Sequence, residues 1–263
     1  MEGLSCERMR ESLLGEATGF RITTFDVLDS TNTYLKSKGV QGEADGAVVL
    51  ADRQLSGRGR MERSFFSPGK TGLYMSILLR REWSVRHALT LTTCAAVAVA
   101  QAIEALIGRR ADIKWVNDIY LDGKKVCGIL CEGNVIPGTD RLDFAVLGVG
   151  VNVCSPSEGF PPELDAIATS LFRGEAPEGA REQLAADILN RLAALLSDEA
   201  AKVYREYRSR CIAIGKRVVV LQGGTQRTAD VLDLDDEFRL VVRWENGQTG
   251  LLDSGEISIR IQS

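Results

Sequence analysis

Residues 51–80, ADRQLSGRGRMERSFFSPGKTGLYMSILLR, carry an arginine- and glycine-rich segment between two apolar runs. The apolar runs, 47–51 and 73–79, are predicted strands. Between them lie four arginines and two glycines within eleven residues: Arg53, Arg58, Arg60, Arg63, Gly57 and Gly59. Such a segment cannot form a packed core element. Since glycine lets a backbone approach a ligand closely and guanidinium groups bind carboxylate and phosphate, we predict a mobile cationic loop for an anionic ligand. The alternative is a solvated basic surface loop.

The segments before this loop are predicted to form a short amphipathic helix over 5–16 and a strand over 21–28. A second helix follows, in which Ser30 or Thr31 is the expected N-cap and Gly39 the expected end. An N-cap position does not exclude a binding role, because the free N–H groups of a helix N-terminus also suit a polar ligand.

The segments after the loop alternate between helix and strand. Ser84 is the predicted cap of a long helix to about Ile107, which is apolar all round and therefore expected to be buried. The strands expected next are 112–115, a hairpin over 118–132 that turns at Asp122-Gly123, and 141–153. This order predicts an α+β fold, with a mixed β-sheet and helices packed on one side of it.

The last hundred residues change character twice. Residues 161–211 show the apolar period of two amphipathic helices. The remaining residues hold about five short strands separated by Gly-Gly, acidic and Asn-Gly turns. We place the boundary near Ile214, which predicts one domain over 1–213 and a small all-β domain over 214–263.

Composition limits the class of protein. The net charge of −4 argues against a dedicated nucleic-acid binder. No uninterrupted apolar stretch approaches the roughly 18 to 20 residues of a membrane span, and the N-terminus lacks the apolar core of a signal peptide, so we expect a cytoplasmic protein without a membrane partner. The six cysteines are scattered and His87 is the one histidine, which predicts reduced thiols and no tightly bound structural metal.

The sequence excludes three common functional motifs. The run 68–71, PGKT, lacks the earlier glycine of a phosphate-binding P-loop, since Ser64 stands there. The run 148–150, GVG, has Val153 where a dinucleotide fingerprint needs its third glycine. A Ser-His-Asp hydrolase would have to use His87, and no nucleophile elbow accompanies it.

Three polar segments remain beside the loop. Lys114-Trp115-Val116-Asn117-Asp118 places an ammonium, an amide and a carboxylate at the end of a predicted strand. In KKVCGIL, residues 124–130, two lysines precede Gly128, at which something can lie close to the backbone. In LGVGVNV, residues 147–153, Asn152 is an amide embedded in an apolar strand and needs partners there.

Taken together, these segments resemble the biotin protein ligases over nearly the whole chain. The matching motifs are Ser30-Thr31-Asn32, Gln54, Gly57-Arg58-Gly59-Arg60, Phe66-Ser67-Pro68, Lys114-Trp115-x-Asn117-Asp118, Lys125-x-x-Gly128-Ile129-Leu130 and Gly148-x-Gly150-x-Asn152. The family usually has proline where Val116 stands and often tryptophan where Phe65 stands. The chain begins too close to its first predicted strand for a winged-helix domain, so the resemblance is to the short form of the family without an N-terminal DNA-binding domain.

The resemblance implies a fold and a reaction. The fold is the class II synthetase-like catalytic domain of biotin and lipoate ligases with a small C-terminal Src-homology-3-like β-barrel. In the reaction, biotin and MgATP give biotinyl-5′-adenylate and pyrophosphate, after which a lysine of a biotin carboxyl carrier protein accepts the biotinyl group. The resemblance implies a monomer or weak homodimer that binds no nucleic acid.

The resemblance also implies residue roles. The catalytic residues would be Lys125, Arg60 and Arg58. The biotin site would comprise Ser30, Thr31, Asn32, Gln54, Gly57, Arg58, Gly59, Arg60, Lys125 and Gly128. The nucleotide site would comprise Arg60, Arg63, Phe65, Trp115, Asn117, Lys125 and Asn152, with Phe65 on the adenine face. Asp118 would contact Mg²⁺.

Two other functions stay open at this point. A lipoate or octanoate ligase or transferase shares the fold and the acyl transfer to a carrier lysine, but the Gly-Arg-Gly-Arg loop favours biotin. A non-catalytic biotin sensor that controls transcription is the second alternative. The complete set of charged residues and the missing DNA-binding domain argue against it.

Overall fold

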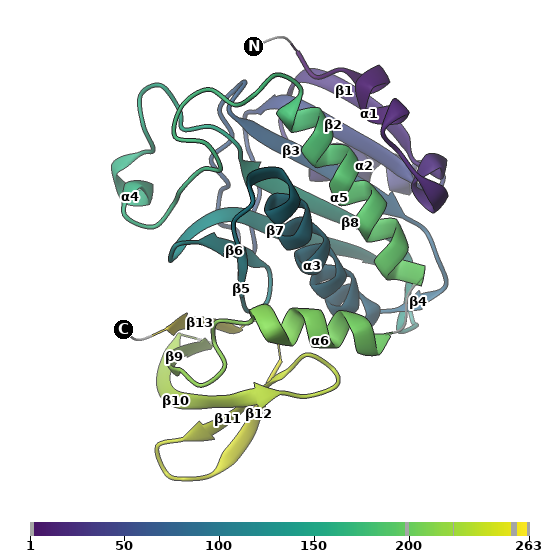
Figure 1. Ribbon diagram of the computed structural model, residues 1–263. Helices are drawn as coiled ribbons and strands as arrows, with labels where there is room; N and C mark the ends of the chain where they lie inside the picture. Colours follow the sequence, from purple (N-terminus) through teal and green to yellow (C-terminus); the bar gives the residue numbers. More distant parts are fainter. Residues whose placement is uncertain (1–2, 198–199, 223, 254–256, 262–263) are drawn as a thin grey trace.

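The computed structural model describes residues 3–197, 200–222, 224–253 and 257–261, and Figure 1 shows its two β-sheets. The larger sheet has the order β1-β2-β3-β8-β7-β6-β5, with β4 pairing β8 at the side. Only β1 and β2 pair in parallel; the other neighbours in this sheet are antiparallel. Its strands are β1 (Arg21–Leu28), β2 (Ala47–Gln54), β3 (Gly72–Leu79), β4 (Trp83–Ser84), β5 (Asp112–Lys114), β6 (Asp118–Leu121), β7 (Lys124–Val135) and β8 (Arg141–Asn152).

Helices cover both faces of this sheet, which corrects the prediction of helices on one side. The helices are α1 (Cys6–Glu11), the 3-10 helix η1 (Gly15–Gly19), α2 (Thr31–Val40), α3 (His87–Ile107), α4 (Pro162–Asp165), α5 (Ala180–Ser197) and α6 (Ala200–Arg210). The main core lies between the sheet, α3 and α5, and a smaller cluster packs α2 on the opposite face through Leu35 and Phe144. All eight residues of β3 are buried for this reason, because a strand covered on both faces has no solvent side.

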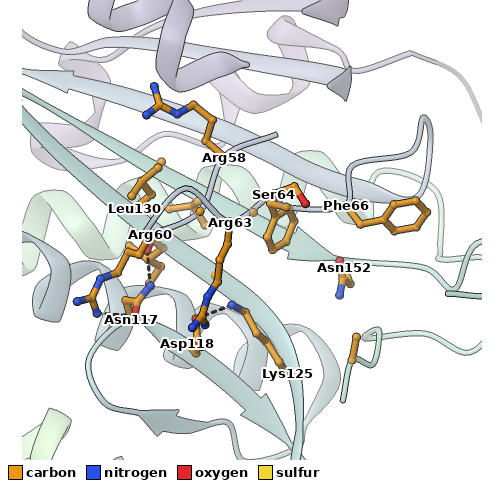
Figure 2. A pocket seen from close by; sticks show the side chains of 18 of the residues that line it. Arg58, Arg60, Arg63, Ser64, Phe66, Asn117, Asp118, Lys125, Leu130 and Asn152 are labelled. Atoms are coloured by element: carbon orange, nitrogen blue, oxygen red, sulfur yellow. Dashed lines mark hydrogen bonds and ion pairs between the residues drawn. The ribbon is translucent and has the colours of Figure 1, made fainter. Parts of the chain in front are cut away.

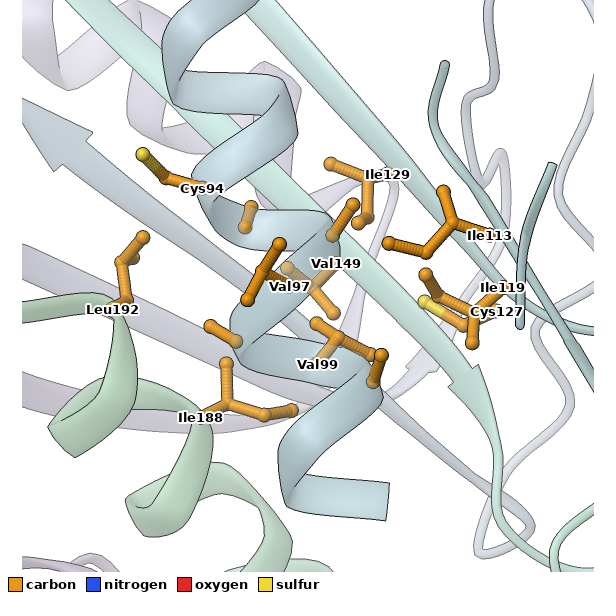
Figure 3. Close-up of a cluster of buried hydrophobic side chains, with 14 of the residues drawn as sticks. Cys94, Val97, Val99, Ile113, Ile119, Cys127, Ile129, Val149, Ile188 and Leu192 are labelled. Atoms are coloured by element: carbon orange, nitrogen blue, oxygen red, sulfur yellow. The ribbon is translucent and has the colours of Figure 1, made fainter. Parts of the chain in front are cut away.

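The long apolar helix α3 is the centre of the main core. Val97 and Val99 pack against sheet residues such as Val149, and α5 contributes Ile188 and Leu192 to the same cluster (Figure 3). Helix α3 has 21 residues and an 18-residue window with a mean hydropathy of 1.6, so it is long and apolar enough to cross a membrane by composition. The sequence prediction concerned an uninterrupted apolar stretch, and Gln101 and Glu104 interrupt this helix. However, 67% of its most apolar window is buried inside the protein, as in the core helix of a globular domain.

Two predicted helix boundaries were also wrong. Arg86 rather than Ser84 precedes the first residue of α3; Ser84 lies in β4, and its backbone N–H donates to Nδ1 of His87 (3.1 Å). Helix α2 continues through Gly39 to Val40, where a Cβ on Gly39 would meet the Phe144 ring. The glycine there allows close packing of helix on sheet and does not mark a helix end.

The predicted five C-terminal strands are confirmed. They are β9 (Arg217–Gln222), β10 (Thr225–Leu234), β11 (Leu240–Trp244), β12 (Thr249–Leu252) and β13 (Ile257–Ile261), in the antiparallel order β12-β11-β10-β9-β13. Within the described part of the chain β12 and β13 are the two open edges of this sheet, so the closed barrel implied by the resemblance is not confirmed. The sheet lies beside α6 (Figure 1).

Candidate active site

A cavity of about 550 Å³ opens where the ends of the large sheet meet the arginine loop (Figure 2). Its walls come from the start of α2, the loop between β2 and β3, the turn between β5 and β6, and the facing strands β7 and β8. All the residues that the sequence predicted for the site line it except Gly57. One pocket therefore joins segments that lie as far apart in sequence as Ser30 and Asn152.

One end of the cavity is polar and neutral. The hydroxyl of Ser76, fully buried in β3, lies 2.6 Å from Oδ1 of Asn32 and 2.7 Å from Oγ1 of Thr31. The backbone N–H of Thr31 donates to Oε1 of Gln54 (2.9 Å), and Nε2 of Gln54 donates to the hydroxyl of Ser67 (3.0 Å). These bonds fix the polar groups of the pocket floor.

The network continues from Asn32 to Glu132 on β7. Nδ2 of Asn32 donates to one carboxylate oxygen of Glu132 (3.1 Å), and the other oxygen pairs with Nζ of Lys36 (3.2 Å) and Nη2 of Arg58 (3.4 Å). The Glu132 side chain is 14% exposed. Burial acts to raise its pKa, but the donors Asn32 and Lys36 and the charge of Arg58 outweigh burial and hold the pKa below its usual range.

The arginine loop folds back on itself as a tight turn. The N–H of Gly59 donates to the Arg63 carbonyl (2.7 Å), and Met61 and Glu62 at the tip both have left-handed φ values, 53° and 60°. Gly57 is buried beneath this turn, where a Cβ would meet the Phe65 carbonyl and the Ser67 hydroxyl. Gly57 does not line this cavity, and its predicted role in biotin binding stays a prediction.

Charged side chains converge at the middle of the cavity. Nη1 of Arg60 donates to Oδ1 of Asn117 (3.2 Å), whose Nδ2 donates to the Ile129 carbonyl (2.7 Å). Nζ of Lys125 lies 2.6 Å from Oδ1 of Asp118 (Figure 2). Burial lowers the pKa of Arg60, although the charge of Asp118 opposes this. The contacts with Asn117 and Asp118 hold Arg60 and Lys125 between the polar end and the rest of the cavity.

Further cations surround the outer end. Arg63, Lys114 and Arg260 also line the cavity. Burial lowers the pKa of the Lys114 ammonium, and the positive charges of Lys125, Arg63 and Arg260 add to that effect. Among the described residues that line the cavity, Asp118 is the one carboxylate facing these cations. Such an excess of positive charge favours a polyanionic ligand.

The position of the Phe65 ring explains why the facing strands β7 and β8 have glycine beneath it. Gly128 of β7 pairs directly with Gly150 of β8, and the Phe65 ring lies over both. A Cβ on Gly150 would lie 2.6 Å from a carbon of this ring, and one on Gly148 would collide with the Asn32 amide. The GVG run predicted as strand is therefore shaped to receive two side chains of the site.

Two residues predicted for nucleotide binding have structural partners. Nδ2 of Asn152 donates to the Thr169 carbonyl (3.0 Å), and Asn152 lines the cavity. The indole N–H of Trp115 donates to the carbonyl of Phe238 in the turn between β10 and β11 (2.9 Å), and Trp115 is 5% exposed. Its ring can contact a ligand only as part of the wall.

Ser76, Glu132 and Arg260 are among the residues of the site that sequence reasoning missed. Ser76 and Glu132 join the floor network, and Arg260 brings a charge from the C-terminal sheet. The first two carried a signal, because each is a polar residue within an apolar strand run and a buried polar group needs partners. Arg260 carried none, since only the tertiary structure brings β13 to the cavity.

The residues for a magnesium ion are sparse. No cluster of three metal-binding side chains occurs among the described residues. Asp118 offers one carboxylate beside the amide of Asn117, which fits a Mg²⁺ that takes most of its ligands from substrate phosphates and water.

Comparisons with known proteins agree with this site. The model of the biotin/lipoate A/B protein ligase family matches residues 24–152. The chain is 41% identical over 168 residues to the bifunctional ligase/repressor BirA of Bacillus spizizenii; this match covers 64% of the chain and spans about half, 51%, of that relative. It is 31% identical to the biotin--[acetyl-CoA-carboxylase] ligase of Mycobacterium tuberculosis over 95% of this chain and 93% of the relative.

Comparison with solved structures also finds a biotin protein ligase. A biotin protein ligase from Aquifex aeolicus in complex with biotin and ATP superposes with a TM-score of 0.76 at 26% identity, covering 92% of this chain and 99% of that one. The cavity here is thus formed in a chain with the fold of a protein that binds biotin and ATP. Because the mycobacterial ligase matches along nearly its whole length, this chain belongs to the biotin protein ligase family.

Proposed function

We propose that this protein is an ATP-dependent biotin–protein ligase that forms biotinyl-5′-adenylate and transfers the biotinyl group to a lysine of a biotin carboxyl carrier protein. The observation that carries the proposal is the division of the cavity into a neutral polar end and a strongly cationic end, joined by Arg60 and Lys125. Biotin has a neutral ureido ring and a carboxylate, and ATP supplies the polyanion.

The protons of the neutral end suit a ureido ring. The Ser76 hydroxyl is the donor toward Oδ1 of Asn32 and Oγ1 of Thr31, and the Thr31 hydroxyl donates to Oε1 of Gln54 (3.1 Å). This leaves a lone pair on Thr31 Oγ1 as an acceptor. Ser30, whose oxygen accepts from the Thr33 N–H, can donate its own proton. A ureido group needs both, since it has two N–H donors and one carbonyl acceptor.

The cations Arg60 and Lys125, between the two ends of the cavity, suit the first chemical step, in which biotin is adenylated. The biotin carboxylate attacks the α-phosphorus of ATP, the bond to the β-phosphate oxygen breaks, and pyrophosphate leaves. Two anions must meet for this, and we propose that Arg58, Arg60 and Lys125, which line the cavity, stabilise the charge that develops in the transition state. Asn117 and Asp118 would hold Mg²⁺ against the phosphates, and the ion would supply further positive charge there.

The second step is transfer of the acyl group. A neutral ε-amine of the carrier lysine attacks the acyl carbon, the bond to the phosphate oxygen breaks, and AMP leaves. The adenylate must be kept from water until then, and we propose that the turn over residues 57–65, which contributes Arg58, Gly59 and Arg60 to the lining, excludes solvent. We place the reaction in the cytoplasm, where ATP and carrier proteins meet.

Two finer assignments belong to the same proposal. Residues 1–213 form the catalytic domain, and residues 214–263 form a separate domain of the Src-homology-3 type. The strand order of the small sheet, which uses residues 217–261 alone, supports the division.

Biotin-dependent exchange of labelled pyrophosphate into ATP by the purified protein tests the first step. Labelling of a biotin carboxyl carrier domain on streptavidin blots tests the second. We expect both, with no exchange when lipoate or octanoate replaces biotin. Exchange driven by lipoate or octanoate instead would establish the rival ligase, and biotin binding without exchange would establish a sensor.

A further inference from the structure

The segment Trp115–Asp118 carries two groups of the proposed site and is held from behind by the protein core. Asn117 and Asp118 face the cavity, whereas the two residues before them are buried. The hydroxyl of Tyr207 on α6 donates to the Val116 carbonyl (3.1 Å), and the Trp115 indole donates to the Phe238 carbonyl (2.9 Å). The position of the site groups therefore depends on contacts made outside the cavity.

These contacts belong to one aromatic group, which we call the aromatic clasp: the buried Trp115, Tyr207 and Phe238 and the half-buried Tyr204. The Phe238 ring meets Tyr207 edge-on at 5.5 Å and Tyr204 at 5.7 Å between centroids. Phe238 has a φ of 59°, and its N–H donates to the Asp235 carbonyl (3.0 Å) in the turn between β10 and β11. The clasp thus links the C-terminal sheet, α6 and the segment of the site.

Tyr207 is the member that reaches the segment itself by a side-chain hydroxyl. It is fully buried, and burial raises its pKa well above the ordinary value, so the phenol keeps its proton at physiological pH. A buried hydroxyl needs an acceptor, and the Val116 carbonyl is the one it has. The bond fixes a carbonyl one residue before Asn117.

We propose that Tyr207 is a positioning residue for adenylate formation: its hydroxyl, through the Val116 carbonyl, holds Asn117 and Asp118 in register with Arg60 and Lys125. The inference rests on the function proposed above. A shift of about 1 Å in groups that orient reactants can slow a reaction by about a hundredfold, so loss of this single hydrogen bond should affect the chemical step.

The molecule provides a matched control in Tyr204. It lies one turn earlier on α6, contacts the same Phe238 ring, and donates its hydroxyl to a backbone carbonyl, that of Leu234 (2.7 Å). Its acceptor lies in β10 rather than beside the site. Tyr204→Phe and Tyr207→Phe therefore remove the same atom from the same helix and the same aromatic group.

The experiment compares biotin-dependent ATP–pyrophosphate exchange in the wild type and both variants, at a temperature at which each is folded by circular dichroism. We expect Tyr207→Phe to lower kcat at least about tenfold, with a change in KM for biotin below about twofold, since the floor network at Thr31 is untouched. Tyr204→Phe should keep kcat within about twofold of the wild type. Equal losses of kcat in the two variants, or no loss in either, would overturn the inference.

A second variant covers the case in which Tyr207→Phe does not fold. Para-aminophenylalanine at position 207 keeps a hydrogen-bond donor at the same place, and we expect its kcat within about threefold of the wild type. A folded protein of this kind with kcat reduced tenfold or more would also overturn the inference. Failure of the wild type to catalyse exchange would instead overturn the proposed function, so the two failures are distinguishable.

Discussion

The charge of Glu132 is expected to stabilise the pocket floor and to hold the arginine loop, and Glu132→Gln tests this. The amide keeps an oxygen for Asn32 but removes the charge that Lys36 and Arg58 share. Hydrogen bonds to charged groups contribute about 1.5–3 kcal/mol and neutral ones about 0.5–1.5. Lys36 and Arg58 are 41% and 46% exposed, so solvent screening reduces the difference. We expect the variant to lose about 1 kcal/mol of unfolding free energy at pH 7.

The loss of unfolding free energy in Glu132→Gln should depend on pH in a characteristic way. Because the folded-state pKa of Glu132 lies below the unfolded value, near 4.3 for glutamate, its charge stabilises the fold above that value, and the contribution disappears as pH falls through the folded pKa. The difference between wild type and variant should therefore be constant from about pH 6 to 8 and shrink toward zero in the acid range.

Urea unfolding followed by circular dichroism at several pH values measures this difference. Glu178→Gln is the control, because Glu178 pairs with Arg8 at the surface and is 81% exposed, so its loss should be undetectable. The KM for biotin of Glu132→Gln should rise about fivefold as Arg58 loosens. A difference in stability that stays the same from neutral to acid pH would refute the reasoning, because it could not come from the carboxylate charge.

Three further predictions concern the cavity. Lys125→Ala removes the cation beside Asp118, and ATP–pyrophosphate exchange should fall at least about a hundredfold with an unchanged melting temperature; exchange at the normal rate would give the role to another lysine. Arg60→Gly frees Asn117 and should release the adenylate, so streptavidin blots of a carrier mixed with bystander proteins should show more bystander labelling than the wild type gives; unchanged carrier selectivity at an undiminished rate would contradict this. Gly150→Ala pushes the Phe65 ring out of place and should raise the KM for ATP or biotin about tenfold, whereas Gly174→Ala, where a Cβ meets open space, should change neither; equal KM values in both variants would contradict the packing argument.

Local patterns in the sequence determined most elements of the fold. Alternating and apolar runs were enough for the strands on both sides of the loop, and Asp122-Gly123 placed the hairpin because both residues adopt positive φ, 48° and 79°, as that tight turn requires. The order of short motifs was enough for the family and for about two thirds of the residues that line the cavity. These signals are local, since each depends on residues close together in the chain.

The tertiary structure decided what depends on register and on distant segments. No pattern within β3 or β7 could show that Ser76 and Glu132 meet around Asn32, because that requires helix α2 to pack on the second face of the sheet. Likewise, Arg260 reaches the cavity and Phe238 reaches Trp115 only through the placement of the C-terminal sheet beside α6. A polar residue within an apolar run indicates that its buried side chain needs a hydrogen-bond partner, but only the packed chain decides which partner it meets.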